Sequence, residues 1–146
     1  MPDVKQFRAL LQAVVDDDRQ TVVRLENEIS EEDFLAYDTF VAAVFYGVVD
    51  QAFPENDLEQ IRDFVDELRS EVPSASGRFK PLIAEGLIRA AIGEEHLLDD
   101  IAPSDQIVLM FPIIRKIVVQ SAEVRESLDD HFTDAEALAE SWSEED

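Results

Sequence analysis

Apolar residues recur at every third or fourth position along most of this chain, the spacing that places side chains on one face of an α-helix. No segment offers the alternation of apolar and polar residues that a partner strand would need. The pattern therefore predicts an all-α fold, a single compact bundle of six to eight helices in one domain, 1–146. The clearest periodic segments are 3–16, 18–29, 31–53, 57–72 and 81–92.

Residues that favour helix starts precede several of these segments. Asp18 and either Asn56 or Asp57 are expected N-caps, because a short polar side chain can accept a hydrogen bond from the first helical turn. Pro81 suits a first turn, where its missing N–H costs nothing. The sequence "SEED" at 30–33 is a variant of the capping box.

The segment 31–53 is the most apolar of the predicted helices. Between residues 34 and 53 only Asp38 and Asp50 are charged. A helix that is apolar on nearly all sides is usually surrounded by other helices. We therefore expect this helix at the centre of the bundle.

The segment 104–121, which contains "IVLMFPIIRKIVV", is the second expected central helix. Its only acid is Asp105. Pro112 predicts either one kinked helix or two helices that meet there, and a pair of strands turning at Pro112 is the alternative. Arg115 and Lys116 are expected at one solvated end of this segment, facing acids of neighbouring helices.

The segment 122–146 is strongly acidic, with Arg125 as its only base. Its pattern predicts two short helices, the second of which starts with a capping box from Thr133 to Glu136. We expect this segment to be partly mobile at its end. Trp142 either docks into a partner or folds back onto Leu138, one turn earlier.

Charge narrows the classes of partner. The chain carries 34 acidic and 12 basic residues, a formal net charge of -22, which argues against direct binding of nucleic acid or of an anionic membrane surface. Its apolar stretches are too short or too charged to cross a bilayer. The absence of cysteine excludes disulfides and thiolate metal sites and fits a cytoplasmic location. Of the macromolecular partners, a basic protein is the class that this charge still allows. The simpler alternative is that the charge only keeps the protein soluble.

Motifs for catalysis, cofactors and metals are missing from the pattern. The four glycines are too scattered for a phosphate-binding loop, and we expect no cofactor and no catalytic residue. Helical bundles that hold metals use Glu-x-x-His pairs, but Gly93 precedes His96 by three positions and Leu128 precedes His131. His96 with Asp99 and Asp100 is most simply a surface pairing, so we predict no metal site.

The leading hypothesis is a non-catalytic acidic module that binds a basic protein, for example an immunity or antitoxin-like inhibitor of a basic toxin, or a nucleic-acid mimic. The alternative is a carboxylate-based metal-binding protein or hydrolase, which needs inward acids such as Asp38 and Asp50. Self-association into a homodimer through an exposed side of the apolar helices is a third possibility. The candidate partner-binding residues are Asp16, Asp17, Asp18, Glu31, Glu32, Asp33, Glu94, Glu95, Asp99, Asp100, Asp129, Asp130 and Trp142.

Overall fold

Helices form all the regular secondary structure of the described residues, which confirms the all-α prediction. The computed structural model describes residues 4–55, 57–71, 81–101 and 103–144, apart from the side chains of a few helical residues. The alternative of two strands that turn at Pro112 is therefore wrong. The elements are α1 (Val4–Val15), α2 (Arg19–Glu28), α3 (Phe34–Ala52), α4 (Leu58–Glu71), α5 (Pro81–Ala91), α6 (Pro103–Gln120) and α7 (Ala122–Glu144), with the 3₁₀ turns η1 (Glu31–Asp33) and η3 (Glu95–Asp100).

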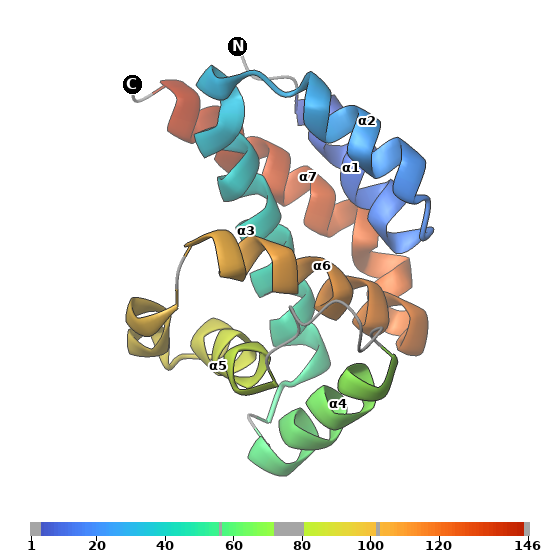
Figure 1. Cartoon of the computed structure of the whole chain (residues 1–146), viewed down its shortest axis with the longest axis vertical. Coiled ribbons are helices and arrows are strands. Elements are labelled where there is room, and N and C mark those ends of the chain that lie inside the picture. The colour runs from blue at the N-terminus through green and yellow to red at the C-terminus, as the bar shows by residue number, and fades with distance from the viewer. Residues whose placement is uncertain (1–3, 56, 72–80, 102, 145–146) are drawn as a thin grey trace.

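The two most apolar helices lie at the centre, as the pattern predicts. α3 packs against α1, α5, α6 and α7, and α6 crosses it while contacting α1, α4, α5 and α7 (Figure 1). Phe40 and Phe45 of α3 and Ile113 and Ile114 of α6 are fully buried. The low acid content of α6 therefore follows from its position in the core, where an unpaired carboxylate would be costly.

α6 is one helix that continues through Pro112. The proline removes one hydrogen bond of the helical ladder, but the apolar side chains on both sides of it remain packed in the core. α6 begins at Pro103, one residue before the expected segment 104–121, so Ser104 lies inside its first turn and is not its cap. A proline suits that first position for the same reason as Pro81 at the start of α5.

The predicted starts of α2 and α4 are confirmed. Asp18 accepts hydrogen bonds from the Thr21 backbone N–H at 3.3 Å and the Thr21 hydroxyl at 2.6 Å. Asp57 Oδ1 accepts from the Glu59 N–H at 3.0 Å. The capping box at 30–33 is wrong, because Ser30 makes no side-chain cap bond and residues 31–33 form the 3₁₀ turn η1 before α3 begins at Phe34.

The last helix differs from its prediction. Residues 122–144 form one helix, α7, so Thr133 lies inside a helix and does not start one. The start is capped by Ser121, whose Oγ accepts from the Val124 N–H at 3.3 Å. Phe132, Ala135 and Ala139 are fully buried on one continuous face, and this packing outweighs the local preference of Thr133 for a cap.

Lys116 also differs from its prediction. Its side chain is only 4% exposed, whereas we expected it in solvent. The Nζ atom donates to Glu71 Oε1 at 2.7 Å and lies 3.4 Å from Glu67 Oε2. It also lies 5.6 Å from the centre of the Phe64 ring. The expected partners, acids of a neighbouring helix, are therefore present, and they hold α4 against α6.

Candidate functional site

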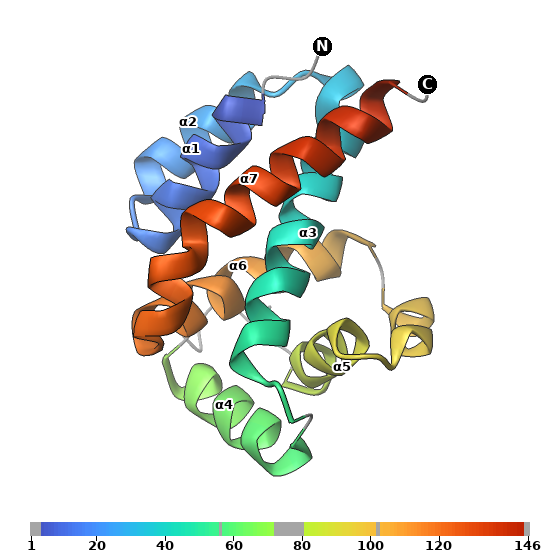
Figure 2. The same ribbon diagram turned by 180° about the vertical axis from the view of Figure 1, so that it is seen from behind.

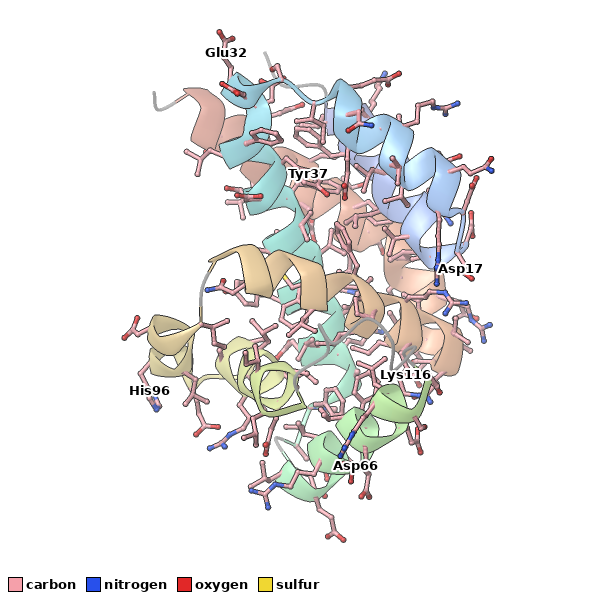
Figure 3. The ribbon with its side chains drawn as sticks, viewed as in Figure 1. Asp17, Glu32, Tyr37, Asp66, His96 and Lys116 are labelled. Atoms are coloured by element: carbon pink, nitrogen blue, oxygen red, sulfur yellow. The ribbon has the colours of Figure 1, made fainter. Side chains whose placement is uncertain are left out.

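The predicted acidic clusters lie in different parts of the molecule. Figure 3 places Glu32 at the top, Asp17 at the right and His96 at the lower left. The clusters at 16–18, 31–33 and 94–100 therefore do not combine into one surface. Among the described helices, none is both long and apolar enough to cross a membrane.

Asp17 and Glu94, both predicted candidates, pair with arginines of this chain. Asp17 lies 3.9 Å from the Arg19 Nε and 3.8 Å from an Arg115 nitrogen. Glu94 accepts two hydrogen bonds from Arg89, at 2.7 and 2.8 Å. These bonds lower the pKa of Glu94 below its usual value. Both carboxylates therefore already serve contacts within the fold.

Arg8 of α1 holds two acids of α7. Its guanidinium donates to Asp129 Oδ1 at 3.0 Å and to Glu136 Oε1 at 2.9 Å. It also lies 5.4 Å from the centre of the Phe132 ring. Asp129 thus joins the first helix to the last, while Asp18 is occupied as the cap of α2.

The other predicted carboxylates are more open. Within the described part of the chain, the exposed members without an ion pair are Asp16, Glu31, Glu32, Asp99 and Asp130. Asp33 is half-buried at the start of α3. The side chains of Glu95, Asp100 and Trp142 lie outside the described residues, although Trp142 belongs to the last turns of α7. The local sequence therefore shows where the acids lie along the chain but not which of them are left without an ion pair or hydrogen bond within the fold.

The acids proposed to point inward do not do so. Asp38 and Asp50 of α3 are both exposed. Neighbouring atoms still remove enough water from the Asp38 carboxyl to raise its pKa above the usual value. Among the described residues, no three carboxylate or imidazole side chains gather closely enough to hold a metal ion.

A buried tyrosine beside an acid is a feature that the sequence pattern does not show. Tyr37 is 5% exposed, and its hydroxyl makes no hydrogen bond of ordinary geometry. Burial, with the nearby Glu26 carboxyl as a second cause, raises its pKa, and burial also raises the pKa of Glu26. Tyr37 is therefore a neutral hydroxyl buried near Glu26 of α2 and is not available as a phenolate.

His131 lies in a polar contact between α3 and α7. Its Nε2 lies 2.9 Å from Gln51 Oε1, and the Gln51 amide donates to Ser127 Oγ at 3.4 Å. The imidazole fills the space left by Gly47, since a Cβ there would lie 2.6 Å from Nδ1. Ser127 is thus hydrogen-bonded to an amide, and among the described residues no carboxylate forms a hydrogen bond with His131. This arrangement fastens two helices and lacks the nucleophile and base pair of a hydrolase.

Comparisons with family models, curated proteins and solved structures give no match for this chain. Function therefore rests on the geometry of the molecule itself. The most distinctive surface is the outer side of α7. Glu126, Asp130 and Asp134 are exposed and four residues apart, so they form one acidic stripe, and no base of the described residues pairs with them.

Proposed function

We propose that the protein is a non-catalytic interaction module that binds a basic protein through its exposed carboxylates, as an immunity or antitoxin-like inhibitor does. The observation that carries the proposal is the unpaired acidic stripe of α7, Glu126, Asp130 and Asp134. Like charges held side by side repel one another, and a partner with lysine or arginine opposite them removes that repulsion. Such a surface also speeds the encounter with a basic partner.

The distribution of charge supports binding over catalysis. The acids that make contacts within the fold either pair with arginine or lysine, as Glu94 and Asp129 do, or cap a helix, as Asp18 does. The acids of the stripe face solvent and add nothing to the core. The metal-dependent alternative is disfavoured because Asp38 and Asp50, its two candidate ligands, lie in solvent.

The test is a capture experiment from native lysate with the tagged full chain, at low and then high salt, followed by mass spectrometry. Two variants with equal charge changes accompany the wild type. One neutralises the stripe, with Glu126→Gln, Asp130→Asn and Asp134→Asn. The other neutralises three exposed acids of α4, with Glu59→Gln, Asp63→Asn and Asp66→Asn.

The expected result is a basic protein that the wild type and the α4 variant retain at low salt and release at high salt, and that the stripe variant loses. Equal loss from both variants would support a basic partner held by overall charge, without a role for the stripe. An empty eluate at low salt would overturn the proposal and leave solubility as the reason for the acidity.

A further inference from the structure

α3 is central, yet one of its sides is open to solvent. Leu35 is 55% exposed and Tyr46 is 37% exposed. They are eleven residues apart, three helical turns, so both project from the same side, and partly buried Ala42 lies between them. The three residues form an apolar stripe about 16 Å long at the helical rise per residue.

α7 extends this apolar surface. The two helices run side by side in Figure 2, and the bond of Gln51 to Ser127 and the contact of His131 with Gly47 fix their pairing. Leu138 of α7 is 44% exposed. It lies four residues, about one turn, beyond Asp134, and seven residues, about two turns, beyond His131, whose ring contacts Gly47 of α3. Leu138 therefore continues the acidic stripe on the side of α7 that faces α3.

Acids surround this apolar surface, and neither α3 nor α7 places a lysine or arginine on it. α3 contains no lysine or arginine, and its Asp38 and Asp50 are exposed on either side of the apolar stripe. The only base of α7 is Arg125. It is nine residues, two and a half turns, from Asp134 and therefore projects from the opposite side of the helix.

The α3–α7 face is defined by these apolar and acidic side chains together. Its members are Leu35, Ala42, Tyr46 and Leu138 at the centre and Asp38, Asp50, Asp130 and Asp134 around them. An apolar centre with a polar rim is the usual composition of a protein interface. The length of the apolar stripe equals about eleven residues of helix.

We propose that the α3–α7 face binds one amphipathic, basic helix of the partner, an inference that rests on the proposed function above. Apolar side chains of that helix, spaced three and four residues apart, would cover the stripe from Leu35 to Tyr46, as helices do in apolar grooves. Its lysines and arginines would lie opposite the surrounding acids. A second copy of this chain fits poorly, because it would place acids against acids.

The test uses a defined probe, a fluorescently labelled 18-residue peptide of leucine and lysine with leucine at helical spacing. A second peptide has the same composition in an order that gives no apolar face. Each is titrated against the full chain and followed by fluorescence anisotropy at low and high salt. Gel filtration with light scattering determines whether the chain dimerises at the same concentrations.

Two variants separate the α3–α7 face from other exposed apolar residues. Leu35→Ser removes a side chain at one end of the stripe. Leu82→Ser is its control, because Leu82 is 81% exposed and belongs to α5, a helix that contributes no residue to this face. Both residues are exposed, so both variants should keep the wild-type unfolding midpoint, which is measured alongside.

The expected result is that the amphipathic peptide binds at least tenfold more tightly than the scrambled one, that Leu35→Ser weakens it severalfold, and that Leu82→Ser does not. Equal binding of the two peptides would overturn the helix-docking proposal and leave a general attraction to basic chains, which is the proposed function alone. Equal affinities of the two variants would overturn the assignment to this face. Dimers that Leu35→Ser dissociates would assign the face to self-association instead.

Discussion

Substitution of Lys116 separates the contribution of its ion pairs from that of its packing. The side chain is 4% exposed, close to the Phe64 ring and between two acids of α4. Lys116→Met keeps most of the volume and removes the charge. Lys116→Ala removes both, so the difference between the two variants isolates the packing of the aliphatic stem.

The acids that Lys116 binds decide the magnitude. The Glu67 and Glu71 side chains are 61% and 56% exposed, so water hydrates them when the ammonium is gone. The large penalty for leaving a charge buried and unpaired therefore does not apply. We expect Lys116→Met to lie within about 1 kcal/mol of wild type, and Lys116→Ala to lose about 2–4 kcal/mol because it leaves a cavity.

Urea denaturation followed by circular dichroism measures both values, since urea does not screen charges as guanidinium does. The pKa of Glu67 is lowered by its hydrogen bonds with Gln120 and Lys116. A lowered pKa gives stability above the unfolded-state pKa that is lost as pH falls through the folded-state value. The advantage of wild type over Lys116→Met should therefore shrink in acid. A loss in Lys116→Met as large as that in Lys116→Ala would refute this reasoning.

Three further results follow from other contacts. Gly47→Ala should destabilise the fold by about 1–3 kcal/mol despite the better helix propensity of alanine, because the new Cβ meets the His131 ring. The double variant Gly47→Ala with His131→Ala should recover part of this lost stability, measured by thermal unfolding. Asp18→Ala should lower the unfolding midpoint at pH 7. Hydrogen bonds from Thr21 lower the pKa of Asp18, so the difference in midpoint between wild type and Asp18→Ala should shrink as the pH falls through that lowered value. A difference that stays constant as the carboxylate is protonated would contradict the capping role. Sodium chloride should raise the midpoint of thermal unfolding measured by calorimetry, because the acidic residues behind the net charge of -22 repel one another. The distance over which salt leaves charges unscreened falls from about 10 Å at 0.1 M to about 3 Å at 1 M. A midpoint that does not change with salt would show that this repulsion is unimportant.

The periodic segments were predictable because burial itself creates their pattern. α3 and α6 were identified as central from their lack of acid, and that signal is local. The error at Thr133 has the opposite cause. A capping box is a local preference of a few residues for starting a helix. The buried face that contains Phe132 and Ala135 continues past Thr133, and its packing outweighs that preference.

The contacts of single polar residues were not predictable in the same way. Lys116 and Glu71 are 45 positions apart, and His131 and Gln51 are 80 apart. Nothing in the local pattern pairs them. A glycine within the apolar helix α3 was the one available signal, since glycine there often marks the close approach of another group. Which carboxylates remain free likewise depends on where distant arginines such as Arg8 and Arg89 lie.

The pairing of α1 with α7 affects how the chain folds during synthesis. Arg8 bonds to residues 121 and 128 positions later, so α1 cannot complete its packing until α7 has left the ribosome. At common elongation rates that takes roughly 6–25 s. The parts of α1, α3 and α6 that α7 covers remain exposed until then. Mutual repulsion between acidic nascent chains would keep neighbouring copies from aggregating before the last helix closes the bundle.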